Sequence, residues 1–431
     1  MNFIREVPIM KKLLSMLLCA LLITLAATAC AELPSYLALK VGEDYTDIQA
    51  DLMILNHRTD LADTKYPQYI AEFTALYPNV TVKFDTITTY ADDALTRLTG
   101  SNWGDIMMIP AQDKDELPTC FIPFGTEAEL MAVCNFANQW VWDGLTYGIP
   151  STGNAQDIVY NALQAIRDNT DAIPLYTNYA AGWTMGAWDA YIGASCNGTA
   201  DFTNRILIHQ HNPFSDRGDG TGPYAMYKVL YDAAALHLIE DDYTTTDWEG
   251  CKGMINQGRI GCMVLGSWAY PQMVEAGPNG DDIGYMSFPI TVSGKQYASA
   301  GADYSFGINK DSSENDQIAA MLFVKWFTEQ SGFAYSEGGI PIDKNGEYPA
   351  VYAAFEGIGF VPDAPAVAGE ETLLNDMNAE TELRINAGGD AKIQEIIEHG
   401  FNGTKTFDEI MDDWNERWTD AQDYLGIEVN E

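Results

Sequence analysis

The sequence predicts an α/β protein with a parallel sheet and more than one domain. Its 431 residues correspond to about two domains of roughly 100 to 200 residues each. Hydrophobic residues make up 47% of the chain and charged residues 20%, so the chain can bury a core and is not a disordered acidic tail. In its first third, short apolar runs alternate with amphipathic segments, which is the strand-helix-strand pattern of a parallel sheet.

The elements of this first part follow from the spacing of apolar residues. Residues 51–55 form a short apolar run, which is typical of a buried strand. Tyr69, Ile70 and Phe73 then fall on one face of a helix that Pro78 ends. The expected order is strand 51–55, helix 67–77, strand 80–84, helix 90–98 and strand 105–109.

The middle of the chain is rich in aromatic residues and loops, and its end is mostly helical. Apolar runs predict strands at 158–161 and 260–265, and helical periodicity predicts helices at 224–238, 248–257, 317–329, 370–383, 391–399 and 407–424. Trp326, Trp414 and Trp418 have apolar neighbours at helical spacing, so we expect them in the core. Asp247 is expected to cap the helix that follows it.

Residues 1–30 have the composition of an export signal. Lys11 and Lys12 precede an apolar stretch that is too short and wrongly flanked for a stable membrane span. Its end, Thr28-Ala29-Cys30, resembles a lipobox, in which Cys30 would be lipidated and become the first mature residue. Cleavage after Ala31 would instead release the chain from the membrane. Residues 31–42 then form a linker.

The chain is strongly acidic, with 23 Lys and Arg against 62 Asp and Glu and a net charge of −39. Such a surface repels phosphate backbones, so we expect no nucleic-acid partner. Five cysteines follow residue 30, and Cys120 with Cys134 or Cys251 with Cys262 could pair, but buried thiols are the expected state. No Cys or His spacing indicates a metal site, and we expect no cofactor.

A polar segment after the first strand is a candidate for ligand contact. Asn56, His57, Arg58 and Asp60 leave that strand at its carboxyl end, where open α/β sheets bind ligands. The alternative interpretation is a solvated loop in which Asp60 caps a turn.

Tryptophans form the second group of candidates. Aromatic rings beside carboxylates and amides can bind a ligand that has both an apolar face and hydroxyl groups. Trp183 and Trp188 lie in the aromatic middle segment, and Trp268 follows a strand and a Gly-Ser turn. The alternative for each of them is packing in the core.

Six short motifs follow one another along the chain: Tyr69-Ile70-Ala71-Glu72-Phe73, Tyr77-Pro78-Asn79-Val80, Gly104-Asp105-Ile106, Asp143-Gly144-Leu145-Thr146-Tyr147-Gly148-Ile149-Pro150, Gly258-Arg259-Ile260-Gly261 and Gly266-Ser267-Trp268-Ala269. In this order they resemble the extracellular solute-binding proteins of family 1, the carbohydrate receptors of ABC importers. The resemblance covers nearly all of the mature chain.

The resemblance implies a two-lobed periplasmic-binding-protein-like fold (type II) with the ligand cleft between the lobes. Lobe one would comprise residues 43–150 and 305–343, and lobe two residues 151–304 and 344–431. The chain would cross between lobes near residues 148–151, 302–304 and 339–341. One departure is that a helix and turn usual in the family after the strand ending at Asn161 are absent, which we expect to weaken lobe two.

The resemblance also assigns roles to single residues. Trp268 corresponds to the stacking tryptophan of the family. Asn154 falls in the loop after the first crossing, where the family often places a polar ligand contact, and Asp303 and Tyr304 fall at the second crossing.

The function that these features predict is binding without chemistry. The chain would be a monomeric receptor at the cell envelope that binds a sugar and delivers it to ABC permease subunits. The alternatives are a secreted glycoside hydrolase, because paired carboxylates beside aromatic rings also describe that chemistry, and a receptor of the same fold for a non-sugar solute.

Overall fold

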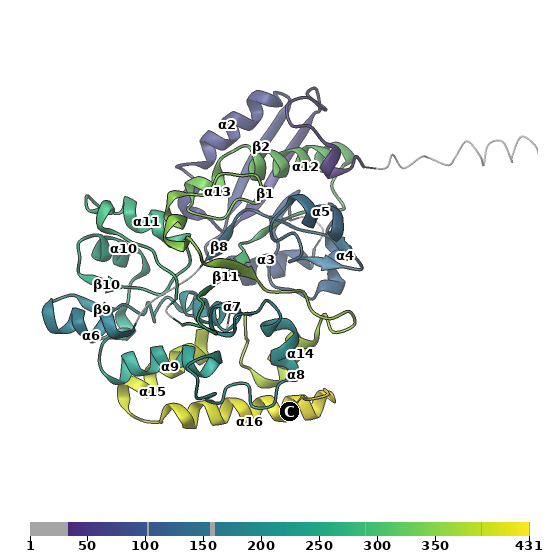
Figure 1. The fold of residues 1–431 in the computed structure, drawn as a ribbon. Helices are drawn as coiled ribbons and strands as arrows, with labels where there is room; N and C mark the ends of the chain where they lie inside the picture. Colours follow the sequence, from purple (N-terminus) through teal and green to yellow (C-terminus); the bar gives the residue numbers. More distant parts are fainter. Residues whose placement is uncertain (1–32, 101–102, 156–159, 289, 389, 431) are drawn as a thin grey trace, which may run out of the picture.

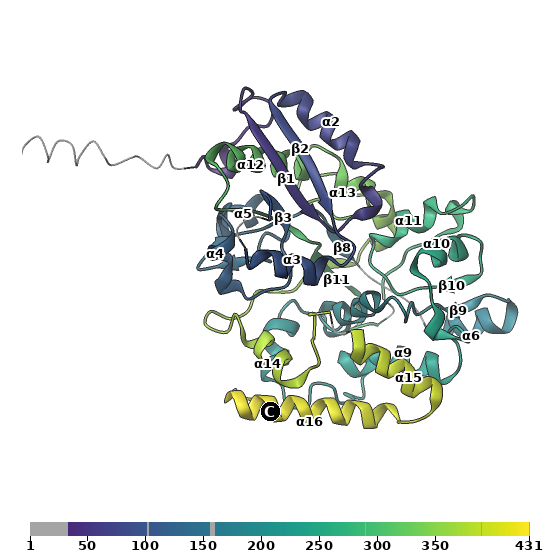
Figure 2. The same ribbon diagram turned by 180° about the vertical axis from the view of Figure 1, so that it is seen from behind.

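The structure is a computed structural model, and it describes residues 33–100, 103–155, 160–288, 290–388 and 390–430. In these ranges, helices and strands gather into two lobes, each around its own hydrophobic core (Figures 1 and 2). The predicted α/β class is therefore confirmed. We call the lobe that begins the described chain lobe one, and the lobe that ends it lobe two.

Lobe one is built on a five-stranded sheet. Strand β1 (Ala50–Asn56) lies parallel to β2 (Val80–Thr86) and to β3 (Ile106–Met108), so the predicted strand-helix-strand start is confirmed. Strand β12 (Ser305–Ile308) runs antiparallel to β3 and to β7 (Ile149–Pro150), which gives the order β2-β1-β3-β12-β7. The chain thus leaves lobe one after β7 and returns at β12 to complete the sheet.

Helices cover this sheet through their apolar faces. Helix α12 (Glu314–Glu329) is buried along most of its length and packs on β1, while α2 (Tyr66–Leu76) packs on β2 (Figure 1). Trp326 of α12 lies in the core, as predicted. Lobe one also contains α3 (Tyr90–Leu98), α4 (Leu117–Cys120), α5 (Glu127–Val133), α13 (Phe333–Ser336), and a small sheet of β4 (Gly125–Thr126), β6 (Leu145–Thr146) and β5 (Val141–Trp142).

The main core of lobe two is helical. Helix α9 (Gly222–Ala235) packs against α15 (Asp390–Asn402), and α16 (Phe407–Leu425) runs along the outer side of both (Figure 2). Trp414 and Trp418 of α16 are fully buried, as predicted. Shorter elements complete this core: the 3-10 helix Gly182–Tyr191, α7 (Ala194–Asn197), α8 (Leu207–His209) and α14 (Leu373–Thr381).

A smaller part of lobe two has its own cluster of buried side chains. It contains the parallel pair β9 (Ile173–Leu175) and β10 (Ile260–Cys262), with α10 (Trp248–Asn256) and α11 (Ala269–Glu275). The expected strand at 260–265 therefore ends at Cys262, because the next residues already turn toward α11.

A second correction concerns the residues before β9. Tyr160 and Asn161 were expected to end a strand, but they begin α6 (Tyr160–Asn169); residues 158 and 159 lie outside the described ranges. Leu163 and Ile166 are three residues apart, so a helix places both on one face. Leu163 is fully buried, and Ile166 packs against the backbone of Gly261 in β10. This packing explains why a helix starts so early.

Three segments that pass between the lobes lie side by side. The Ser151 N–H donates to the carbonyl of Tyr304 at 3.0 Å, and the Asp303 N–H donates to the carbonyl of Thr152 at 2.9 Å. The Thr152 hydroxyl donates to the carbonyl of Ile340 at 3.3 Å. These bonds bring all three predicted crossings into contact.

A three-stranded sheet extends this junction. Strand β11 (Tyr297–Ala302) lies between β8 (Gly153–Ala155), which is antiparallel to it, and β13 (Gly359–Pro362), which is parallel. Tyr352 and Phe355, in the segment that the resemblance assigns to lobe two, pack with the core of lobe one. The last crossing thus includes a short return to lobe one before the chain enters α14.

The five cysteines after residue 30 are free thiols, of which Cys134, Cys196 and Cys251 are buried, as expected, and Cys120 and Cys262 are only partly buried. Among the described residues, no helix combines the length and the apolar character that a bilayer crossing requires. Within the same ranges, no group of three His, Cys, Asp or Glu side chains is placed to hold a metal ion.

A buried ion pair joins two helices of lobe two. The Lys392 ammonium lies 2.6 Å from the Asp189 carboxylate, and the two side chains are 4% and 1% exposed. Asp189 also accepts the Tyr227 hydroxyl at 2.7 Å and the Asn386 N–H at 3.1 Å. Burial lowers the pKa of Lys392, and the charge of Asp189 opposes that shift. The carboxylate thus has three partners that replace water.

We expect Lys392→Met to destabilise lobe two strongly, because it leaves the Asp189 carboxylate buried without a cation. Removing one member of such a pair costs about 3 to 5 kcal/mol. Lys228→Met is the matched control, because Lys228 pairs with Asp232 on the surface of α9, where the loss is below about 1 kcal/mol. Calorimetric melting measures both variants, and equal losses would contradict this account.

Candidate functional site

The polar segment after β1 turns sharply at the edge of the lobe-one sheet. Asn56 ends β1 and is buried, and its side-chain oxygen accepts the backbone N–H of Arg58 at 2.8 Å. Asn favours such turns because its side chain can bond the backbone two residues further on. This bond fixes the direction in which His57 and Arg58 leave the strand.

His57 lies among aromatic rings that come from distant parts of the chain. Its ring centre is 4.4 Å from that of Tyr304 and 5.8 Å from that of Tyr90. Burial lowers the pKa of His57 to about 4, and the charge of nearby Asp303 opposes that shift, so the imidazole is neutral at pH 7. Its Nδ1 atom is buried without a hydrogen-bond partner in the described part of the chain. The structure therefore brings the candidates His57, Asp303 and Tyr304 together.

Arg58 and Asp60 belong to a row of four charged side chains, Asp60, Arg58, Glu337 and Lys65, which we call the lobe-one charge network. Arg58 donates to both carboxylate oxygens of Asp60, at 2.9 and 2.7 Å, and to Glu337 at 2.7 Å. Lys65 donates to the other oxygen of Glu337 at 2.5 Å. The Glu337 side chain is 5% exposed, so it bridges two cations in a nearly dry position.

Lobe two contributes Trp183, Trp248 and Trp268, which we call the tryptophan cluster. The ring centre of Trp183 lies 5.2 Å from that of Trp248 and 5.5 Å from that of Trp268, and the latter two are also 5.5 Å apart. Trp183 is 57% exposed. Its turn is packed tightly, since a side chain at Gly182 would collide with Asp390 of α15. The exposed ring of Trp183, beside the partly buried rings of Trp248 and Trp268, offers a platform for the apolar face of a ligand.

The tryptophan cluster and the charge network face each other across the lobes. The Tyr352 hydroxyl lies 2.8 Å from the Ser267 hydroxyl and 3.1 Å from the Gly338 carbonyl oxygen, so the residue before Trp268 is tied to the residue after Glu337. The Lys252 ammonium lies 4.8 Å from the centre of the Trp248 ring. The same ammonium is close enough to Asp60 of lobe one to act on its ionisation.

Two candidates lie elsewhere. Trp188 is 2% exposed in the core of lobe two, against Phe288, so the structure places it in the core rather than at an open surface. Trp183 and Trp188 share one 3-10 helix, and residues five apart point to different sides of it. Asn154 lies in β8 opposite Gly301, and its side chain is outside what the structure describes.

The sequence did not reveal Trp248, Glu337 or Lys65. Trp248 follows Asp247, whose carboxylate caps α10 by accepting the Glu249 N–H at 3.1 Å, as predicted. Helical spacing places Trp248 at the start of a helix, but it does not show whether its ring lies in a core or at the surface that faces the other lobe. Lys65 and Glu337 are 272 residues apart, so no local pattern joins them.

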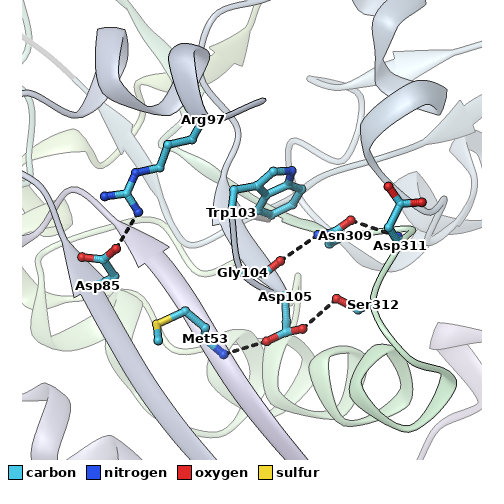
Figure 3. Close-up of a pocket in the computed structure, with 9 residues that line it drawn as sticks. All are labelled: Met53, Asp85, Arg97, Trp103, Gly104, Asp105, Asn309, Asp311 and Ser312. Atoms are coloured by element: carbon cyan, nitrogen blue, oxygen red, sulfur yellow. Dashed lines mark hydrogen bonds and ion pairs between the residues drawn. The ribbon is translucent and has the colours of Figure 1, made fainter. Parts of the chain in front are cut away.

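A separate cavity of about 480 Å³ lies on lobe one (Figure 3). Its polar side chains mostly bond one another: Arg97 pairs with Asp85 at 2.6 Å, and Ser312 donates to Asp105 at 2.7 Å. None of the candidate residues lines this cavity. The two facing surfaces described above are therefore the better candidate site.

These two surfaces suit a neutral, flat ligand with many hydroxyls. Aromatic rings cover an apolar face of such a ligand, and carboxylate, guanidinium and imidazole groups bond to its rim. Charges of both signs lie side by side on lobe one, so the surface does not favour an ion of either sign. A sugar has this combination of features.

We expect His57→Gln to change how stability depends on pH. The unfolded wild-type chain takes up a proton at His57 below about pH 6.5, whereas the folded chain does so only near pH 4. Wild type therefore loses stability at this residue as the pH falls through that window, and the variant does not. As the pH is lowered from about 7 to about 4.5, the Tm of the variant minus the Tm of wild type should therefore increase. Calorimetry across this range measures it, and a constant difference would refute a buried neutral His57.

Comparisons with known proteins identify the family of this chain. The family model of bacterial extracellular solute-binding proteins matches residues 59–332. A manno-oligosaccharide-specific solute-binding protein from Bifidobacterium animalis subsp. lactis, solved with mannotriose, is 46% identical with a TM-score of 0.86, and the match covers 91% of this chain and 99% of that one. A binding protein of an ABC transporter from the same organism, solved with mannobiose, is also 46% identical, with a TM-score of 0.87 and the same coverage.

More distant structures share the fold alone. RafE from Streptococcus pneumoniae is 15% identical with a TM-score of 0.63, and the match covers 87% of this chain and 99% of that one. A comparison with curated proteins gave no match. The two-lobed periplasmic-binding-protein-like fold (type II) is confirmed by these relatives and by the family match. The family model spans more than half of the chain, and relatives 46% identical span nine-tenths of it, so this chain belongs to the bacterial extracellular solute-binding proteins.

Proposed function

We propose that this protein is the extracytoplasmic receptor of an ABC importer and that its ligand is a manno-oligosaccharide. The observation that carries the proposal is the tryptophan cluster on lobe two facing the charge network on lobe one. Two relatives that are 46% identical were solved with mannotriose and mannobiose, which supports this choice of sugar.

The site residues have distinct roles in this proposal. Trp268 and Trp183 stack on sugar rings, with Trp248 supporting both. His57 supplies a neutral imidazole. Its buried Nδ1 has no hydrogen-bond partner among the described residues, and in this proposal it bonds to a sugar hydroxyl. Asp60 accepts further hydroxyls, held in place by Arg58.

Binding should close the lobes over the sugar. A ligand that touches both lobes binds the closed state better than the open one, and that difference in affinity is what shifts the equilibrium. The permease then receives the closed, loaded receptor. No step in this account breaks a bond in the sugar.

We expect mannotriose and mannobiose to raise the Tm and to remain intact. A ligand at about 100 times its Kd adds about 2.7 kcal/mol of stability. Thermal melting against these sugars, with maltotriose as the comparison, measures binding, and chromatography of the same samples measures cleavage. Repeated cleavage of the sugar by each protein molecule would favour a glycoside hydrolase. Stabilisation by a non-sugar solute alone would favour a receptor of the same fold for such a solute.

The same assay tests the placement of the site with Trp268→Ala. Loss of a stacking ring costs a few kcal/mol, so mannotriose affinity should fall about a hundredfold while the fold persists. Trp326→Ala is the control, because that ring lies in the core of lobe one and should affect the Tm rather than the Kd. The reverse result would move the site away from the tryptophan cluster.

We further propose that the chain is exported as a monomer, anchored through a lipidated Cys30, and docks with permease subunits. The lipobox-like end of the apolar stretch supports this, although Cys30 lies outside the described residues. Intact-mass analysis of protein from the cell envelope should find a diacylated chain that begins at Cys30. A chain that begins at Glu32 would show free secretion instead.

A further inference from the structure

Charges of opposite sign approach each other between the lobes, beside the proposed site. On lobe one, Lys65 is bonded to Glu337, and Gly338 follows directly. A side chain added at Gly338 would come within 3.0 Å of Pro271, so this segment packs on the start of α11 (Figure 1). Glu275 is four residues after Pro271 and therefore shares its face of the helix. Glu275 therefore lies at the end of the helix whose start packs beside Glu337, the residue that bonds Lys65.

Glu337 and Glu275 both affect the pKa of Lys65. Burial opposes the charge of Lys65, but the hydrogen bond and charge of Glu337 and the charge of Glu275 together raise its pKa above the usual value. Glu275 is exposed, and no direct ion pair joins it to Lys65 or to another cation among the described residues. The two side chains are thus near each other without being in contact.

A second pair lies beside the first with its signs reversed. Here the carboxylate, Asp60, is on lobe one and the cation, Lys252, is on lobe two. Lys252 is held over Trp248 and bonds Glu249 at 2.9 Å. Burial opposes the ionisation of Asp60, but the hydrogen bond and charge of Arg58, with a smaller contribution from Lys252, lower its pKa.

We infer that Lys65 and Glu275 form an ion pair across the lobes in the sugar-bound state and strengthen sugar binding without touching the sugar. The inference rests on the proposed function, because binding is what closes the lobes. Asp60 and Lys252 add a second contact with the opposite polarity. A sliding movement of one lobe would bring like charges together, so the two pairs also favour one closed arrangement.

This contact has a consequence that direct sugar contacts do not share. A manno-oligosaccharide is neutral, so its hydrogen bonds and stacking respond little to ionic strength. An ion pair at the protein surface is screened by salt, since the Debye length falls from about 10 Å at 0.1 M to about 3 Å at 1 M. The affinity for a neutral sugar should therefore weaken as salt rises.

The test is a double-mutant cycle on mannotriose binding, measured by calorimetry at low and high NaCl with the full mature chain. An exposed ion pair contributes about 0.2 to 1 kcal/mol, so Lys65→Met and Glu275→Gln should each weaken binding about 1.4- to fivefold at low salt. If the pair forms, Glu275→Gln should have little effect in the Lys65→Met background. Both single variants should also lose part of the salt dependence, and the part that remains belongs to the contact of Asp60 with Lys252.

The surface pair Lys228 and Asp232 provides the matched control, since it lies within α9 and far from both surfaces. Lys228→Met and Asp232→Asn should leave the Kd and its salt dependence unchanged. Additive effects of Lys65→Met and Glu275→Gln, or a salt-independent Kd in wild type, would overturn the ion pair while leaving the receptor function intact. A wild-type chain that does not bind mannotriose would overturn both.

Discussion

The hydrogen-bonded junction of the three chain crossings is the constraint on which the rest of the structure depends. Ser151, Thr152, Asp303 and Tyr304 bond through their backbones, and Thr152 also bonds Ile340. Bonds of this kind fix the positions of the segments that follow each crossing. Residues that are hundreds of positions apart, such as His57 and Tyr304, therefore meet at one edge of the lobe-one sheet.

In the proposed function, the charge network places cations of an acidic protein at a site for a neutral ligand. Glu337 is nearly dry, and a buried carboxylate is costly unless cations and hydrogen bonds surround it. Arg58 and Lys65 supply both, so their charges are largely balanced inside the protein. What remains at the surface is a set of oriented donors and acceptors, which suits hydroxyl groups better than ions.

The tryptophan cluster leaves apolar surface in contact with water, whereas the charge network keeps a carboxylate nearly dry. Three indole rings in contact would normally be buried, because large aromatic side chains carry much of the apolar area of a core. Here Trp183 is 57% exposed, and the neighbouring Gly182 packs closely against the Asp390 side chain of α15. In the proposed function, this apolar surface needs little reordering when a sugar covers it, so exposure of Trp183 serves binding rather than stability.

The sequence by itself determined the alternation of strands and helices, the buried tryptophans of α12 and α16 and the family, because apolar spacing and short motifs are local properties. It also indicated that ligand contacts would follow β1 and the second crossing. Only the tertiary structure placed Trp188 in the core and joined Trp248, Glu337 and Lys65 to the site. Which side chains meet between two lobes depends on how the lobes pack, and the local sequence carries no trace of partners that lie hundreds of residues away.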